Sequence, residues 1–256
     1  MLTSENYYQN NDYFSYSQYR KFSKCQAAAM AEIRGDYKPE TSDDMLVGQY
    51  IDAYISGELE QFISEHPYII SSRGPTQGEL KQQFKHANTM IERFTRDKLF
   101  AEYLQGDKQV ILTGTIAGIP VKGKLDIMHP DRIVDFKSVK DFEPIWYEGY
   151  KTNFVEAWNY DLQGGIYQEL VRQNTGKLLP YYIAAVTKEK VPDIALIHLS
   201  DNLLEARLDL VSYHLPEYQA IKIGLSEPVR CEKCDWCKQS KTLHGPVNLD
   251  DWGATE

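Results

Sequence analysis

Two carboxylates and one lysine near the middle of the chain have the types and spacing needed for metal-assisted hydrolysis. Asp126 lies near the end of one strand-like segment, and Asp135 and Lys137 lie on the next. Side chains two residues apart on a strand point to the same face, so Asp135 and Lys137 can converge on one metal ion and one water. Phe136 would point to the opposite face and leave its backbone carbonyl as a further ligand. Hydrolysis of a phosphodiester with Mg²⁺ requires such clustered oxygen ligands beside a basic group.

The neighbours of Asp135 favour this chemistry over an ordinary surface ion pair. A lone Asp-x-Lys in a strand is usually exposed. Here the aspartate lies within Ile133-Val-Asp-Phe136, and a carboxylate in so apolar a strand is costly unless a cation or hydrogen bonds compensate it.

The surrounding periodicity predicts an α/β fold with a mixed central sheet flanked by helices. Helices are expected at about 15–33, 45–57, 77–103, 155–175 and 201–223. Strands are expected at 109–113, 116–121, 123–128, 132–137, 179–187 and 193–199, the first four as a meander. We interpret the 256 residues as one domain. It would have an N-terminal helical part (about 1–105), a catalytic core (about 106–200), and a C-terminal helix with a cysteine motif (about 201–256).

These motifs resemble the RecB-like branch of the PD-(D/E)XK nucleases. The stretches Gly123-Lys-Leu-Asp126, Asp135-Phe-Lys137 and Gln163-Gly-Gly-Ile-Tyr167 follow that family's pattern in order. The resemblance implies a restriction-endonuclease-like core and a Mg²⁺- or Mn²⁺-dependent deoxyribonuclease. It also implies that Gln163 and Tyr167, four residues apart on one helical face, face the active site.

The same resemblance implies a further metal ligand upstream. Many relatives carry Gly-x-x-x-His on a helix, and here Gly48 is followed four residues later by Asp52. Aspartate is a natural ligand for a hard cation, so Asp52 is predicted to assist Asp126, Asp135 and the Phe136 carbonyl.

The four cysteines form a second candidate site. Cys231, Cys234 and Cys237 are too closely spaced for easy mutual disulfides, so metal or cluster ligation in a reducing compartment is favoured. Together with Cys25 they resemble AddB and the CRISPR-adaptation nuclease, in which one N-terminal and three C-terminal cysteines hold a 4Fe–4S cluster. Thiolates suit zinc equally, and free thiols are a third alternative.

The overall layout resembles phage and prophage exonucleases similar to the nuclease domain of RecE. That resemblance implies an exonuclease acting on duplex DNA ends in recombination, with a single-strand annealing protein as partner. One alternative is an iron–sulfur nuclease of CRISPR adaptation or AddB-like repair. Another is a non-catalytic module that binds DNA ends.

The charge limits how DNA could be bound. A net charge of −9 excludes a uniformly basic nucleic-acid coat, so DNA contacts must be local, and a homo-oligomer enclosing the duplex is expected. The lysines predicted to contact DNA are Lys122, Lys124, Lys140 and Lys151. No apolar run reaches the roughly 18 residues of a membrane span, so a cytoplasmic protein without a membrane partner is expected.

Overall fold

The structure, a computed structural model, describes residues 2–40, 42–147, 149–243, 245–246 and 248–249. The chain forms two compact units. Unit 1 comprises Met1–Tyr16 and Pro39–Pro216, and unit 2 comprises Ser17–Lys38 and Glu217–Glu256. Unit 2 therefore combines segments from both ends of the chain, unlike the three consecutive parts predicted from the sequence. That the whole chain is one domain stays a prediction.

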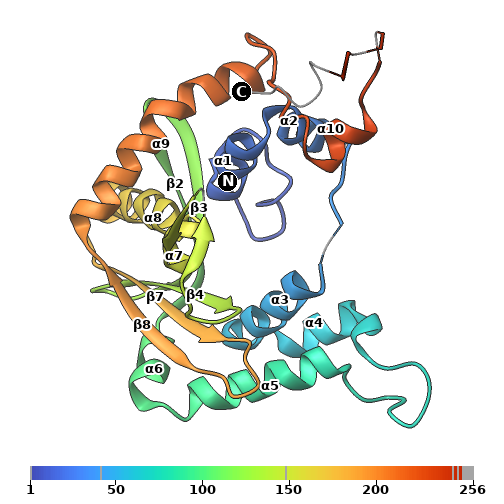
Figure 1. The fold of residues 1–256 in the computed structure, drawn as a ribbon. Coiled ribbons are helices and arrows are strands. Elements are labelled where there is room, and N and C mark those ends of the chain that lie inside the picture. Colours follow the sequence, from blue (N-terminus) through green and yellow to red (C-terminus); the bar gives the residue numbers. More distant parts are fainter. Residues whose placement is uncertain (1, 41, 148, 244, 247, 250–256) are drawn as a thin grey trace. The chain divides into compact units, whose positions relative to one another are not determined.

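Unit 1 is built on a six-stranded mixed sheet, which confirms the predicted fold class (Figure 1). Its strands are β1 (Phe14–Ser15), β2 (Asp107–Ile116), β3 (Ile119–Met128), β4 (Ile133–Val139), β7 (Tyr181–Thr187) and β8 (Ile194–Leu199). The order is β1-β3-β4-β7-β8, with β2 on β3. The β1–β3 and β4–β7 pairs are parallel, and the others are antiparallel.

The prediction of two short strands at 116–121 and 123–128 is wrong. The structure has one long hairpin, in which β2 and β3 pair from Asp107–Met128 to Ile116–Ile119. The turn lies at Ala117 and Gly118, whose φ values of 50° and 76° give the left-handed backbone of a two-residue hairpin turn. Residues 119–128 therefore form one continuous strand, with Gly123 in its interior.

One face of the sheet is covered by the N-terminal helices of unit 1. These are α3 (Asp43–Ser56), α4 (Leu59–Glu65), α5 (Gln82–Thr95) and α6 (Lys98–Tyr103), with the 3₁₀ turn η1 (Pro67–Ile69). Val134 and Phe136 of β4 belong to the same buried apolar cluster as these helices. The Phe136 ring lies 5.5 Å from that of Phe94 on α5. Since side chains alternate along a strand, Asp135 must face the opposite side.

That opposite side carries α8 (Tyr160–Thr175), preceded by α7 (Phe154–Ala157) (Figure 1). Helix α8 lies close to the sheet because Gly164 and Gly123 lack side chains: a Cβ on Gly164 would meet the Tyr181 ring of β7 at 3.0 Å. A small hairpin of β5 (Ile145–Tyr147) and β6 (Tyr150–Thr152) precedes α7 and was not predicted.

Local capping residues explain where the helix predictions hold and where they fail. Helix α3 agrees with its prediction, because the Ser42 side chain caps its N-terminus and Gly57 ends it at φ 76°. The expected helix at 77–103 is divided, since Asp97 caps a new helix, α6. The expected helix at 155–175 is divided at Asn159, whose φ is 58°.

The first expected helix is also divided, into α1 (Tyr16–Lys24) and α2 (Gln26–Arg34). Cys25 adopts an extended backbone (φ −164°) and its thiol accepts a hydrogen bond from the Ala28 amide, so it caps α2. The remaining helices are α9 (Asp201–Lys222), which crosses from unit 1 into unit 2 at Pro216, and α10 (Asp235–Gln239). Among the described residues, no helix combines the length and apolar composition of a membrane span.

Candidate functional site

The site begins at an opening in the sheet beside β3. One edge of β3 pairs with β2 along its length. The other edge pairs with β1 at Val121 and Lys122 and with β4 at Ile127 and Met128. In the described part of the chain no strand pairs with this edge between those points, so β3 and β4 separate at Asp126 and remain unpaired toward Gly123.

Asp126 lies where the two strands diverge. Continuing the register of Ile127 with Val134 by one residue places Asp126 opposite Asp135. At this position the Phe136 amide donates a hydrogen bond of 3.0 Å to Oδ2 of Asp126. The carboxylate thus takes the place of the backbone carbonyl that a paired strand would offer. The two aspartates are thus neighbours, as the motif predicts.

Asp135 is almost completely buried, at 1% exposure. Its Oδ1 accepts a hydrogen bond of 2.9 Å from Gln163 on α8. Its Oδ2 forms an ion pair with the Lys137 ammonium but has no aligned hydrogen bond within the described residues. A buried carboxylate oxygen with unused acceptor capacity is suited to a cation.

Electrostatics at the site indicate a deficit of positive charge. Burial, together with the nearby Asp126 carboxylate, raises the pKa of Asp135 to about 7, against the opposing effect of Lys137. Burial and the charge of Asp126 also raise the pKa of the half-buried Asp52 on α3 well above its ordinary value. A divalent cation would favour the ionised forms of Asp52 and Asp135 and so offset the effect of burial on both carboxylates.

Lys137 remains a cation in this environment. Burial lowers its pKa, but the charges of Asp135 and Asp126 outweigh this effect and raise the pKa above its ordinary value. Its ammonium lies 4.9 Å from the centre of the Tyr160 ring at the start of α8. Lys137 is therefore a charged donor and cannot readily accept a proton.

Gln163 and Tyr167, both predicted to face the active site from α8, make different contacts. Gln163 contacts Asp135 directly. Tyr167 is buried and packs against β3, where a Cβ on Gly123 would approach its ring at 3.0 Å. Burial first, and then nearby charges including Asp135, raise the pKa of Tyr167 well above its ordinary value, so it stays a neutral phenol.

A buried ion pair positions α8. Asp161, two residues before Gln163, is 1% exposed and accepts a hydrogen bond of 2.7 Å from the Arg207 Nε on α9. Neither residue was singled out from the sequence, where Asp161 reads as an ordinary acidic residue of a helix's first turn.

The lysines predicted to contact DNA differ in how far they are buried. The prediction for Lys122 is wrong: it is 2% exposed, and its ammonium donates to the Tyr7 and Asn10 carbonyls. Lys124 is half-buried two residues before Asp126. Lys140 and Lys151 are exposed, and their contact with DNA stays a prediction.

The cysteine site lies wholly in unit 2. The Sγ atoms of Cys25, Cys231, Cys234 and Cys237 all lie within 4.8 Å of one another, and no disulfide joins them. Among the described residues, these four cysteines are the one set of His, Cys, Asp or Glu side chains close enough together to hold a metal ion. The Asp52, Asp126 and Asp135 carboxylates do not form such a compact set.

Spacing and hydrogen bonds at the cysteines fit a single ion. Sγ of Cys237 lies 3.6 Å from that of Cys25 and 3.9 Å from that of Cys231. Four thiolates at zinc–sulfur bonds of about 2.3 Å in a tetrahedron are about 3.8 Å apart. In a 4Fe–4S cluster each thiolate binds a different iron, which spreads the sulfurs farther. Burial raises the pKa of Cys231, but the amides of Lys233 and Cys234 outweigh it, and the pKa falls to about 6.

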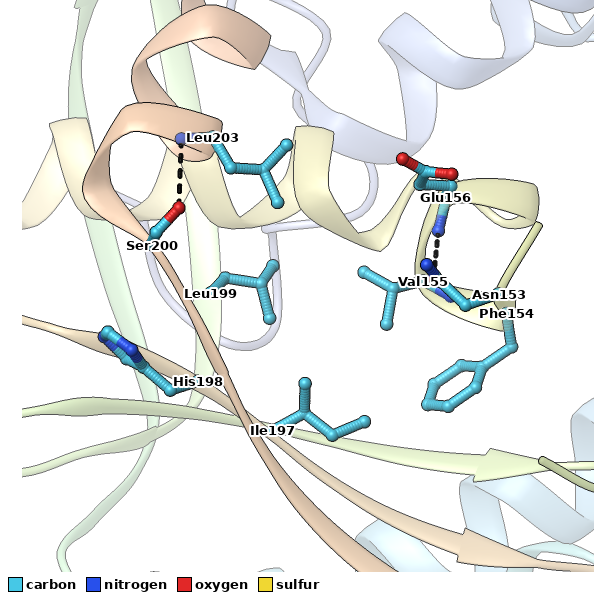
Figure 2. Close-up of a pocket in the computed structure, with 9 residues that line it drawn as sticks. All are labelled: Asn153, Phe154, Val155, Glu156, Ile197, His198, Leu199, Ser200 and Leu203. Carbon is cyan, nitrogen blue, oxygen red and sulfur yellow. Dashed lines mark hydrogen bonds between the residues drawn. The ribbon is translucent and has the colours of Figure 1, made fainter.

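A further pocket of about 470 Å³ lies elsewhere in unit 1 (Figure 2). Figure 2 shows apolar side chains of α7, β8 and α9, among them Val155, Leu199 and Leu203, directed into it. None of the candidate site residues lines this pocket. Its size therefore does not identify it as the place of chemistry.

Comparison with known proteins agrees with the fold and the motif. Residues 15–240 match a family model described as "PDDEXK-like domain of unknown function" (DUF3799). A crystal structure of a protein from Eubacterium rectale, described as a "putative exonuclease", is 40% identical. The match covers 99% of this chain and 98% of that one, with a TM-score of 0.94. No curated protein matches the chain. The chain belongs to the DUF3799 family of PDDEXK-like domains.

Proposed function

We propose that this protein is a divalent-metal-dependent nuclease that degrades DNA from duplex ends. The observation that carries the proposal is the gathering of Asp126, Asp135 and Lys137 where β3 and β4 diverge. The buried Asp135 Oδ2 pairs with Lys137 but accepts no aligned hydrogen bond within the described residues, so it has acceptor capacity for a metal ion. The exonuclease description of the similar Eubacterium rectale protein supports the same conclusion.

Hard oxygen donors fit a Mg²⁺ or Mn²⁺ ion. Asp126, Asp135 and the Phe136 carbonyl would hold it, with Asp52 approaching from α3. When bound, such an ion stabilises negative charge on the phosphate and makes a coordinated water more acidic.

The protein's own residues would orient and neutralise the reacting groups. Gln163 fixes the Asp135 carboxylate through its 2.9 Å hydrogen bond. The Lys137 ammonium, held between Asp135 and the Tyr160 ring, can donate to a phosphate oxygen and offset the charge that develops there. Because Lys137 is already protonated, its role is to position and stabilise and not to remove the proton of the attacking water.

The biological setting follows the resemblance to phage and prophage exonucleases. We propose resection of one strand at a duplex end, in the cytoplasm, followed by transfer of the exposed strand to an annealing protein. An oligomer that encloses the duplex would concentrate the exposed Lys140 and Lys151 around the DNA despite the net charge of −9.

For the cysteine site we propose one tetrahedrally coordinated ion, with zinc as the ion that fits best. The observation favouring it over a 4Fe–4S cluster is the close Sγ spacing. Metal analysis of protein purified without oxygen decides between them. Zinc near one equivalent in a colourless sample supports the proposal, whereas brown protein with several irons and inorganic sulfide per chain contradicts it.

The nuclease proposal is tested with end-labelled linear duplex and closed circular duplex, with and without Mg²⁺. We expect metal-dependent loss of the linear substrate and persistence of the circle. D126N should be inactive. D131N is the matched control, because Asp131 lies in the exposed turn between β3 and β4. Equal cleavage of circles would contradict the end specificity, and activity in D126N would contradict the site.

A further inference from the structure

The N-terminal segment of unit 1 forms consecutive turns before β1. The Thr3 amide donates to the Asn6 side chain at 2.8 Å. The Tyr7 amide donates to the Thr3 carbonyl and the Asn10 amide to the Asn6 carbonyl, each at 3.0 Å. Consecutive turns of this kind give the segment a defined backbone before β1.

A buried lysine fastens this segment to β3. The Lys122 ammonium donates to the carbonyls of Tyr7 and Asn10, the second at 2.6 Å, and lies 4.6 Å from the centre of the Tyr7 ring. A lysine at 2% exposure is costly unless its charge is compensated. These contacts satisfy it and fix Tyr7 against the strand that carries Asp126.

The two adjacent tyrosines then have opposite environments. Tyr7 is 6% exposed, whereas Tyr8 is 77% exposed. Their rings meet edge to face at a centroid distance of 5.2 Å. Tyr7 is thus the anchor, and it holds Tyr8 as a large aromatic ring presented to solvent.

Tyr8 lies beside the candidate active site. The Lys124 ammonium is 5.8 Å from the centre of its ring, and Lys124 precedes Asp126 by two residues on β3. Side chains two residues apart on a strand share a face, so the Tyr8 ring lies near the face of β3 that carries Asp126. An exposed ring, a neighbouring cation and the proposed hydrolytic centre therefore occupy one region of unit 1.

We propose that the exposed ring of Tyr8 is a stacking platform for an unpaired nucleobase of the DNA strand being cut. The inference rests on the proposed nuclease function and extends it to a base subsite. Every base offers a flat π face, so such a platform tolerates any sequence, and the neighbouring Lys124 provides a cation for the adjoining phosphate. A base can stack there only when it has left its own pair, so the preferred substrate is a frayed or single-stranded end.

Binding can be tested apart from cleavage with the full-length protein in EDTA. The probe is a single-stranded oligonucleotide carrying 2-aminopurine near one end, whose fluorescence falls when the base stacks. Y8A should abolish the quenching and weaken binding about 5-fold to 150-fold, the range of base–aromatic stacking. Y8F should retain both properties. Y213A is the matched control, since Tyr213 on α9 is 79% exposed. Quenching and affinity unchanged in Y8A would overturn the platform, as would an equal loss in Y213A.

A parallel measurement separates this inference from the proposed function. Cleavage by the unaltered protein is followed in Mg²⁺ and in Mn²⁺ with single-stranded and blunt duplex ends. Y8A should raise KM for single-stranded ends far more than it lowers kcat. An unaltered protein that stacks the probe but never cleaves would refute the nuclease and leave Tyr8 a binding residue. Normal cleavage with an unaffected Y8A would refute only the platform.

Discussion

Replacing Gly165 with alanine should destabilise unit 1, although alanine is the better helix former. Gly165 lies in α8 between Gln163 and Tyr167, where α8 crosses α9. A Cβ added there would lie 2.7 Å from the Leu204 carbonyl oxygen and 3.2 Å from the Leu208 amide nitrogen. Both are backbone atoms of a helix, so the clash can be relieved only by moving the helices apart.

The size of the effect follows from two opposing contributions. Overpacking of this kind costs about 1–3 kcal/mol. Alanine in a helix interior is more favourable than glycine by about 1 kcal/mol. The net expectation is a loss that reaches about 2 kcal/mol, which corresponds to a fall of up to about 8 °C in Tm for a protein of this size.

Gly48 on α3 provides the matched control. It too is a helix-interior glycine, but a Cβ there would meet only the Ser138 Oγ, at 3.6 Å, which is ordinary contact. G48A should therefore leave stability unchanged or raise it by up to about 1 kcal/mol. Urea unfolding followed by far-UV circular dichroism measures both variants, and the midpoint for G165A should fall without a change in slope. A G165A midpoint at or above that of the unaltered protein would refute the close approach of α8 and α9.

Three further substitutions test other parts of the structure. K137A should abolish cleavage of end-labelled DNA with little change in the unfolding midpoint, because it removes the cation paired with Asp135; residual cleavage would exclude the proposed role. R207A should destabilise the protein by about 1–3 kcal/mol in urea unfolding, because the buried Asp161 carboxylate loses its charged hydrogen bond. Unchanged stability would mean that Asp161 is neutral. C25S should lower the bound metal per chain, measured by elemental analysis; full occupancy would show that the other three cysteines suffice.

Much of the candidate site was predictable because it depends on short-range periodicity. The two-residue alternation of β4 places Asp135 and Lys137 on the face opposite Phe136 whatever the rest of the chain does. Apolar spacing likewise predicted a helix at about 45–57, close to the observed α3. These features depend on residues adjacent in sequence, so the sequence alone suffices.

The helix and strand boundaries that were wrong depend on single backbone conformations. A pattern of apolar residues continues through Cys25, Asp97 and Asn159, and nothing in its period reveals that the backbone leaves the helix there. In the same way nothing in the sequence indicated that the strands expected at 116–121 and 123–128 form one continuous strand, in which the missing side chain of Gly123 admits the Tyr167 ring.

Tertiary structure alone decided which distant residues meet, because such contacts depend on how the elements pack. The sequence by itself determined the PDDEXK motif and the count and placement of the four cysteines. Only the folded chain showed that Lys122 is buried and donates hydrogen bonds to the N-terminal segment. The same contacts place the exposed Tyr8 ring beside Lys124, two residues before Asp126. Lys122 lies four positions before Asp126 on the same strand and therefore looks like a DNA contact in the sequence. The carbonyls that accept its hydrogen bonds are more than a hundred residues away in sequence, so only the folded chain reveals them.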